Sequence, residues 1–282
     1  MAGSRSRRPV PVRSGAELAR DFSNVPVVVL CGGLGTRLRE ETEVRPKPMV
    51  PVGTHPILWH ILRSYSHYGF KRFILCLGYK SEVIKSYFLN YTSLNSDFTV
   101  KLKSNHLVVH SIDHEDDWEV TLAYTGELTM TGARVALAVA KYLGSASHFA
   151  VTYGDGLTDA NLAQEYEFHV AQGRVGTVLG VNPPSRFGEL RVDDAQVMEF
   201  SEKPDFVDSW INGGYFFFRR EFVRYLSSEE SCVLEREPLI QLARDGQLSV
   251  FKHPGFWACM DTQRDRDHLN ALWDSGKAPW AV

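Results

Sequence analysis

Short apolar runs alternate with helix-length amphipathic segments in the first third of the chain. Residues 27–30 and 73–77 are continuous apolar runs, as expected for strands buried on both faces. Residues 56–68 and 81–87 carry apolar side chains at helical spacing, and we expect Ser81 to cap the second helix. This repeat of strand and helix predicts right-handed βαβ units and a parallel sheet.

The apolar period changes to two between residues 97 and 124. Apolar and polar residues alternate at 98–103 and again at 120–124, so we expect antiparallel hairpins inserted into the parallel sheet. Three histidines recur there at steps of four: His106, His110 and His114. Because an even spacing on strands places side chains along one face, we interpret them as part of a solvated or subunit-facing strand. A metal cluster is the less favoured alternative.

The same strand and helix patterns continue to the C-terminus. We expect Thr131 to cap one helix and Asp261, supported by Thr262, to cap another. The expected elements are helices from 131 to about 142, over 159–172 and up to about 273, and strands over 149–153 and 175–181. The prediction is an α/β fold with a mixed, mostly parallel sheet flanked by helices.

A glycine-rich loop follows the first strand, at the sheet edge where such folds bind ligands. Residues 31–37 read Cys-Gly-Gly-Leu-Gly-Thr-Arg. Glycines permit positive φ and close approach, and successive backbone N–H groups form an anion-binding concavity. Arg37 and Lys47, which lies between two prolines, add fixed positive charge. The stretch predicts a polyphosphate site, since a plain tight turn would explain the glycines but not the cations.

Two common phosphate-binding motifs do not fit this loop. No Walker A string occurs. A dinucleotide-binding fingerprint needs its third glycine at the position of Leu38. It also needs a long helix that runs straight out of the loop, and the prolines of Arg-Pro-Lys-Pro at 45–48 do not permit one. An NAD-dependent oxidoreductase is therefore disfavoured.

A carboxylate lies at the end of another predicted strand. Asp155 stands between two glycines directly after the apolar run 149–153. Magnesium takes hard oxygen ligands, usually one or two carboxylates together with substrate phosphates. Asp155 is therefore a candidate Mg²⁺ ligand, and an ordinary aspartate in a turn is the alternative.

Composition excludes several classes of protein. The chain has 282 residues, 44% hydrophobic and 23% charged, with a net charge of −3, so nothing indicates nucleic-acid binding. No apolar run approaches the roughly 20 residues of a membrane span. The four cysteines form no Cys-x-x-Cys pair, which favours a reduced, cytoplasmic protein. Residues 1–25 are rich in Arg, Ser and Pro and predict a disordered basic extension before a single domain at 26–282.

The strings GGLGTRL and RPKPMVPVGTHPILWHIL resemble the signature of the sugar-phosphate nucleotidylyltransferases. The later strings TMTGARV, TYGDG, RFGEL, FSEKP, INGGYF, HPGFWACMDT and GKAPW follow in that family's order, so the resemblance runs from about residue 26 to 280. It implies a Rossmann-like fold. The family usually has two glycines before the arginine of TMTGARV, whereas Ala133 takes the second place here.

The resemblance also implies roles for individual residues. Arg37 and Lys47 would be catalytic, Asp155 and Asp261 would hold Mg²⁺, and Thr129 and Arg134 would contact the nucleotide base. The full nucleotide-binding set would be Leu30, Gly32, Gly33, Leu34, Gly35, Thr36, Arg37, Lys47, Thr129, Arg134 and Gly154. Lys203 would bind the sugar phosphate, and Glu202 and Asn212 the sugar hydroxyls.

The implied reaction is transfer of a cytidylyl group from CTP to α-D-glucose 1-phosphate, which yields CDP-glucose and pyrophosphate. The catalytic motifs leave open another nucleotide, such as dTTP or UTP, or another phosphorylated acceptor. A non-catalytic sensor of nucleotide sugars is less favoured, because Lys47 and Asp155 are both present. The resemblance further implies a homo-oligomer, and we expect a hexamer built partly through residues 97–124.

Overall fold

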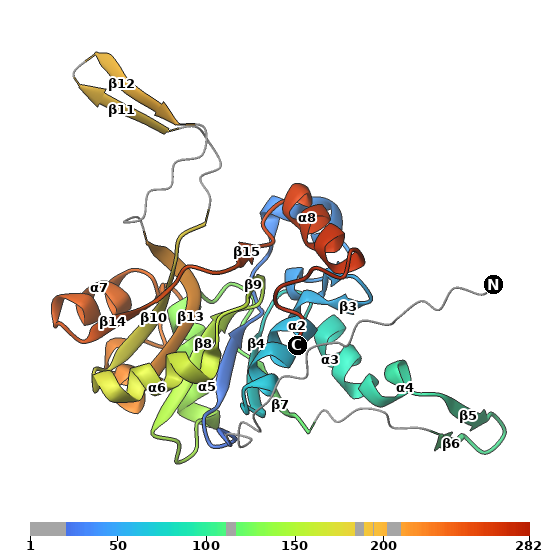
Figure 1. Cartoon of the computed structure of the whole chain (residues 1–282). Helices are drawn as coiled ribbons and strands as arrows, with labels where there is room; N and C mark the ends of the chain where they lie inside the picture. Colours follow the sequence, from blue (N-terminus) through green and yellow to red (C-terminus); the bar gives the residue numbers. More distant parts are fainter. Residues whose placement is uncertain (1–20, 111–116, 184–188, 194, 202–209) are drawn as a thin grey trace, which may run out of the picture.

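The computed structural model describes residues 21–110, 117–183, 189–193, 195–201 and 210–282. Its centre is a seven-stranded sheet in the order β14-β10-β13-β8-β1-β4-β7 (Figure 1). Strand β13 is antiparallel to both of its neighbours, and every other pair in this sheet is parallel. These strands are β1 (Val27–Leu30), β4 (Arg72–Leu77), β7 (Glu119–Tyr124), β8 (His148–Tyr153), β10 (Gly176–Val181), β13 (Ile211–Arg219) and β14 (Leu248–His253).

Helices cover both faces of the sheet, so each central strand is buried on two sides. Val27 and Val29 of β1 belong to one hydrophobic core, and Val28 belongs to the other. This division explains why β1 is continuously apolar rather than alternating. Helices α2 (Ile57–His67), α3 (Ser81–Leu89), α6 (Leu162–Gln172) and α8 (Gln263–Asp274) contribute to the first core, and α5 (Thr131–Tyr142) and α7 (Glu237–Arg244) to the second. The predicted fold class is confirmed.

Short elements and small sheets complete the described chain. Four two-stranded sheets lie outside the main sheet: β2 (Pro51–Val52) with β3 (His55–Pro56), β5 (Phe98–Lys101) with β6 (His106–Val109), β9 (Gly156–Thr158) with β15 (Trp257–Cys259), and β11 (Glu189–Asp193) with β12 (Gln196–Ser201). The remaining helices are short: η1 (Thr36–Leu38), α1 (Arg39–Thr42), η2 (Lys47–Met49), α4 (Tyr91–Asn95) and η3 (Arg220–Tyr225).

The alternating segment between residues 97 and 124 is only partly the hairpin structure that its pattern predicts. Strands β5 and β6 form an antiparallel hairpin, but it is separate from the main sheet and projects away from it (Figure 1). The prediction was wrong for β7, which pairs in parallel with β4 as an edge strand. Any strand with only one face toward the core alternates, whether its neighbour is parallel or antiparallel, so the two patterns look alike. Of the three histidines, His114 lies outside the described residues, and His110 hydrogen-bonds Thr99 across the hairpin at 2.7 Å.

Three of the predicted helix caps were wrong. Helix α3 is preceded by Lys80, which has a φ of 49° and provides no side-chain cap. Helix α5 is preceded by Met130, and the hydroxyl of Thr131 instead donates to Glu235 and accepts from the N–H of Leu234. For α8 the N-cap is Thr262, which forms a capping box with Asp265. The carboxylate of Asp261 therefore does not cap the helix and can make other contacts. Helix α6 begins at Leu162, three residues later than expected, because Asn161 caps it.

The two ends of the described chain pack against the domain. Residues 1–20 of the expected extension lie outside the described residues, so its disorder stays a prediction. Phe22 stacks on Phe70 with 5.0 Å between ring centroids. At the other end Trp280 is 2% exposed and stacks on Phe256. Among the described residues, no helix combines the length and apolar composition needed to cross a membrane.

Candidate active site

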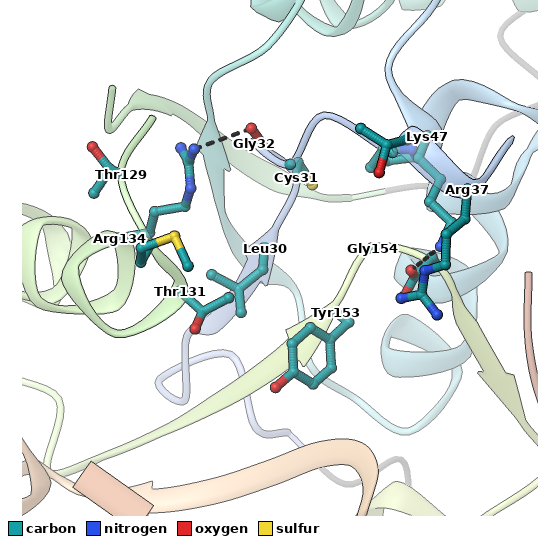
Figure 2. A pocket seen from close by; sticks show the side chains of 16 residues that line it. Leu30, Cys31, Gly32, Arg37, Lys47, Thr129, Thr131, Arg134, Tyr153 and Gly154 are labelled. Atoms are coloured by element: carbon teal, nitrogen blue, oxygen red, sulfur yellow. Dashed lines mark hydrogen bonds and ion pairs between the residues drawn. The ribbon is translucent and has the colours of Figure 1, made fainter. Parts of the chain in front are cut away.

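A cavity of about 360 Å³ opens at the carboxyl ends of β1 and β8, where the parallel strands of such a sheet are expected to meet a ligand (Figure 2). Ten of the eleven predicted nucleotide-binding residues line it; Leu34, which is 45% exposed, does not. The ten are Leu30, Gly32, Gly33, Gly35, Thr36, Arg37, Lys47, Thr129, Arg134 and Gly154. The structure thus brings together residues that are more than 120 positions apart in the sequence.

The three loop glycines serve three different purposes. A Cβ at Gly32 would lie 2.1 Å from the guanidinium of Arg134, so this glycine permits a close approach. Gly35 has a φ of +64°, and a Cβ there would lie 2.7 Å from the methyl group of Thr42. A Cβ at Gly33 would have no atom within 4 Å. Only Gly35 therefore needs the left-handed conformation, while Gly33 leaves its backbone accessible from the cavity.

The loop after the glycines is anchored from two other elements. The hydroxyl of Thr42 donates to the carbonyl of Gly35 at 3.1 Å. The hydroxyl of Tyr79, just beyond β4, donates to the carbonyl of Thr42 at 3.0 Å. Arg266 on α8 forms an ion pair with Glu41. These contacts hold the loop in one conformation, so its backbone is preorganised for a ligand.

The side chain of Arg134 connects several segments of the chain by hydrogen bonds. It is 4% exposed, and its two terminal nitrogens donate to protein oxygens on three segments around the cavity. The acceptors are the carbonyls of Leu77, Gly126, Glu127 and Gly32 and the hydroxyl of Thr125. Figure 2 shows the bond to Gly32. With these donors engaged, the predicted pairing of Arg134 with a nucleotide base stays a prediction.

Lys47 lies between two carboxylates. Its neighbours Pro46 and Pro48 place it on η2, and its Nζ donates to Asp155 Oδ2 and to Asp261 Oδ1 at 2.6 Å each. Arg37 donates to the other oxygen of Asp261 at 2.7 Å. Burial alone would lower the pKa of Lys47, but the two carboxylates outweigh it and the pKa is raised. The ammonium group is therefore charged at neutral pH.

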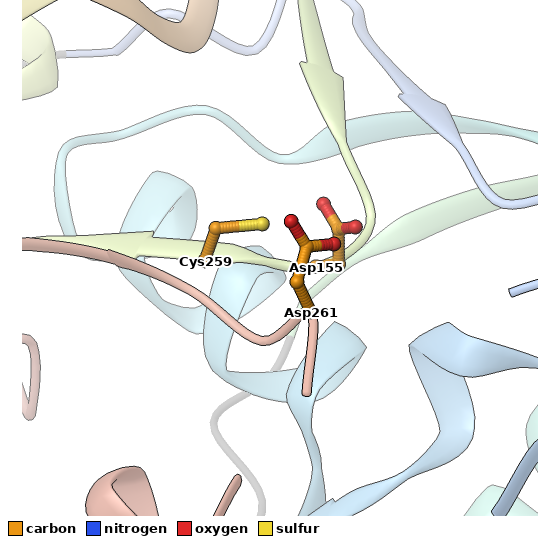
Figure 3. Close-up of side chains that lie close together, drawn as sticks. All are labelled: Asp155, Cys259 and Asp261. Atoms are coloured by element: carbon orange, nitrogen blue, oxygen red, sulfur yellow. The ribbon is translucent and has the colours of Figure 1, made fainter. Parts of the chain in front are cut away.

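Pairing of β9 with β15 brings the two carboxylates together. Cys259 is opposite Gly156 in this ladder, and the N–H of Met260 donates to the carbonyl of Asp155 at 2.9 Å. Asp155, Cys259 and Asp261 each offer a ligand atom, and the three atoms lie within 4.8 Å of one another (Figure 3). Among the described residues this is the one such group. Sequence reasoning missed Cys259, and its position two residues before Asp261 was the available signal.

The donor set fits a divalent cation. Both carboxylates are partly buried, with side-chain exposures of 24% for Asp155 and 17% for Asp261. The ammonium of Lys47 already occupies a place between them as a cation bound by their oxygens. Hard oxygen ligands, usually one or two carboxylates, are what Mg²⁺ takes from a protein. Asp155 and Asp261 are therefore the residues that would hold it.

Only one of the three predicted sugar-binding residues can be placed. Asn212 lines a second cavity, of about 230 Å³, which also contains Asp155 and Asp261. Its side-chain oxygen accepts from the N–H of Gly214 at 2.8 Å, which fixes its orientation. Glu202 and Lys203 lie outside the described residues. Asp155 thus lines both cavities, and Asp261 lines the second.

Tyr153 lines both cavities and was not predicted. Its hydroxyl donates to one oxygen of Glu235, and the hydroxyl of Thr131 donates to the other at 2.8 Å. Burial raises the pKa of Tyr153, so the phenol stays protonated. Its position directly before Gly-Asp-Gly at a strand end was the available signal. Glu235 thereby joins the end of β8 to the start of α5.

The glycine loop, the two cations and the paired carboxylates together define a phosphate-handling α/β enzyme. The chain belongs to the nucleotidyl transferase family, whose model matches residues 26–258. The predicted family membership is confirmed.

Three known proteins show what the chain is similar to. It is 46% identical over 253 residues to a glucose-1-phosphate cytidylyltransferase of Salmonella typhi, covering 90% of this chain and 97% of that protein. It is 41% identical over 255 residues to a Bacillus subtilis protein named "Probable glucose-1-phosphate cytidylyltransferase", covering 90% of this chain and 98% of that protein. A solved UDP-glucose pyrophosphorylase with UDP-glucose has a TM-score of 0.62 at 15% identity, covering 89% and 99% of the two chains, and shows a shared fold.

Proposed function

We propose that this chain transfers the cytidylyl group of CTP to α-D-glucose 1-phosphate, with CDP-glucose and pyrophosphate as products. The observation that carries the proposal is Lys47 between Asp155 and Asp261, next to a glycine-loop cavity that Lys47 and Asp155 line. The relatives named for this reaction, at 46% and 41% identity over 90% of the chain, support the choice of substrates.

The reaction is an in-line displacement at phosphorus. An oxygen of the sugar phosphate attacks the α-phosphorus of CTP, and the bond from that phosphorus to the bridging oxygen of pyrophosphate breaks. The attacking phosphate is already ionised at neutral pH, so no general base is needed. The protein has to position the two anions and to stabilise the charge that develops between them.

Each part of the site has one task in this mechanism. The backbone N–H groups from Gly32 to Gly35, with Arg37, bind the β- and γ-phosphates. Lys47, which is buried and charged, stabilises the α-phosphate, where negative charge increases. A Mg²⁺ ion held by Asp155 and Asp261 would supply Lewis-acid charge at the transferred phosphate. Asn212 faces the second cavity, where the sugar would lie next to the carboxylates.

We assign the base to the part of the cavity lined by residues 129–131. Thr129, Met130 and Thr131 lie beside Arg134 there, and Thr129 is 5% exposed. In this structure Arg134 donates hydrogen bonds to backbone carbonyls around this part of the cavity. We therefore infer that Arg134 positions the backbone of the base site. Comparison of CTP with UTP and dTTP tests the assignment, because uracil and thymine exchange the hydrogen-bonding functions of cytosine at N3 and N4.

The direct test is a pyrophosphate-release assay with CTP, glucose 1-phosphate and Mg²⁺. Lys47→Met removes the proposed charge and keeps much of the side-chain volume. Lys141→Met, on the exposed side of α5, is the matched control for loss of a lysine. We expect release from the parent and the control and little from Lys47→Met. Absence of release from the parent with every pyrimidine nucleotide would refute the proposed function.

We also propose that the chain assembles into a homo-oligomer, with a hexamer as the expected form. The projecting β5–β6 hairpin and the helices before it expose several large apolar side chains: Leu89, Leu94, Phe98, Val100, Leu102 and Leu107. Such a concentration is unusual on a monomer surface. Light scattering after size-exclusion chromatography tests this, with Leu102→Lys as the disrupting variant.

We place the reaction in the cytoplasm, and four free cysteines suit a reducing compartment.

A further inference from the structure

The third side chain at the carboxylate pair is a thiol. The sulfur of Cys259 points toward the carboxylates of Asp155 and Asp261 (Figure 3). Cys259 is partly exposed and lines the same 230 Å³ cavity as both aspartates, so an ion can reach it from solvent. A cysteine that served only the hydrophobic core would face the interior, as Cys76 does at 0% exposure.

The backbone holds these three side chains in fixed relation. Cys259 ends β15 and Asp261 follows two residues later, and their ligand atoms lie within 4.8 Å of each other. Asp155 directly precedes Gly156, the ladder partner of Cys259. The indole N–H of Trp257 donates to the carbonyl of Gly213 at 2.7 Å and ties β15 to the end of β13. The pairing of β9 with β15 thus brings together the turn that carries Asp155 and the segment after β15 that carries Asp261.

The distances suit a small four-coordinate ion. Ligand atoms of tetrahedral zinc lie roughly 3.5 Å from one another, given bond lengths near 2.0–2.3 Å. The three ligand atoms here lie within 4.8 Å of one another, which is close to this spacing. Three protein ligands leave one position for water or a substrate phosphate, which is the arrangement of catalytic zinc sites.

We propose that Cys259 is a third metal-binding side chain, so that thiophilic divalent cations such as Zn²⁺, Co²⁺ and Cd²⁺ bind Asp155, Cys259 and Asp261 together. Magnesium, which prefers oxygen, uses the two carboxylates without the sulfur. When a thiophilic ion binds, the metal–sulfur bond forms as the S–H bond breaks, and the proton passes to solvent. This inference rests on the metal assignment in the proposed function and adds a second class of ion to the site.

A metal ion at this site competes with Lys47, because both bind the same carboxylate oxygens. Lys47 Nζ donates hydrogen bonds to Asp155 Oδ2 and Asp261 Oδ1, so any ion that binds these oxygens displaces the ammonium group. A thiophilic ion gains a sulfur ligand that Mg²⁺ does not use. We therefore expect Zn²⁺ to bind more tightly than Mg²⁺ in the absence of nucleotide and to inhibit when it is in excess.

Cobalt absorption tests the proposal on the full chain. The protein is treated with a chelator, freed of it, kept reduced with a non-thiol reductant and titrated with Co²⁺ alone. We expect a saturable thiolate-to-cobalt charge-transfer band in the near ultraviolet for the parent. The band should be lost in Cys259→Ser and in Cys259→Ala, and kept in Cys232→Ser, which removes another partly exposed thiol. Competition with Zn²⁺ should show at least about a tenfold weaker Zn²⁺ affinity for Cys259→Ser.

The outcomes separate this inference from the proposed function. Circular dichroism first establishes that each variant is folded, and the alanine variant covers the case in which a serine oxygen binds metal. A band that persists without Cys259, or a parent without a band, overturns the thiol site. If such a parent still releases pyrophosphate with Mg²⁺, the proposed function stands. A parent that shows the band but releases no pyrophosphate refutes the function and retains the site.

Discussion

Glu165 is an acid that the fold keeps inside the hydrophobic core. It lies on α6 at 0% exposure, and neither carboxyl oxygen has a hydrogen-bond partner among the described residues. Its environment includes the phenol rings of Tyr65 and Tyr215, whose pKa values it helps to raise. Burial raises the pKa of Glu165 from 4.5 to about 8. The folded protein therefore binds this proton more tightly than the unfolded chain does.

The sign of the pH dependence follows from that difference. Stability from the bound proton is fully present below the unfolded pKa of 4.5 and is lost as pH rises toward the folded pKa of about 8. Linkage over this window gives a loss of about 4 kcal/mol in the free energy of unfolding between about pH 5 and pH 9. Glu165→Gln keeps the shape and removes the titration. The variant should therefore gain stability over the parent as pH increases.

Urea unfolding followed by tryptophan fluorescence, at several pH values and constant ionic strength, measures the effect. The quantity of interest is the variant's free energy of unfolding minus the parent's, which should rise by about 4 kcal/mol across that range. Burial lowers the pKa of His169 to about 3, but that group is common to both proteins and cancels. Glu167→Gln, at an exposed position of the same helix, is the control and should show no such rise. A difference independent of pH would refute the reasoning and indicate a hydrated or paired carboxylate.

Three further predictions concern the site. Lys47→Ala should lower kcat by roughly 10²–10³ in the pyrophosphate assay, the scale for one preorganised charged group, and a loss below threefold would contradict its role. Asp155→Asn and Asp261→Asn should be non-additive, with the double variant little worse than either single one, because both serve one ion. Multiplicative losses would instead indicate separate roles. Arg134→Leu should lower the free energy of unfolding by at least about 2 kcal/mol in urea, because it leaves buried carbonyls unpaired. An unchanged stability with an altered CTP to UTP preference would indicate that Arg134 contacts the base.

The glycine loop and the first carboxylate were predictable from the sequence because each depends on local chemistry. Gly35 needs positive φ, Lys47 is fixed by flanking prolines, and Asp155 follows an apolar strand. Each of these properties belongs to a few consecutive residues and to the backbone conformation that they permit. The strands and helices of the parallel half were predictable for the same reason, since burial on both faces demands continuous apolar runs.

Edge strands and helix caps were less predictable. Strand β7 alternates because Val120 and Leu122 share the face that packs against the first core, and that pattern does not reveal whether the neighbouring strand is parallel. The cap of α8 was placed one residue early, because Asp261 and Thr262 are both good cap residues. Tertiary contact decided between them, since Lys47 and Arg37 engage Asp261.

The sequence by itself determined the class of fold, the glycine loop and the types of charged group available for phosphate chemistry. The tertiary structure alone decided how those groups meet. It placed the ammonium of Lys47 between two carboxylates that are more than 100 residues apart, and it brought Cys259 beside them through strand pairing. It also engaged the donors of Arg134 with backbone oxygens. Distances between side chains from distant segments depend on packing, which no local pattern encodes.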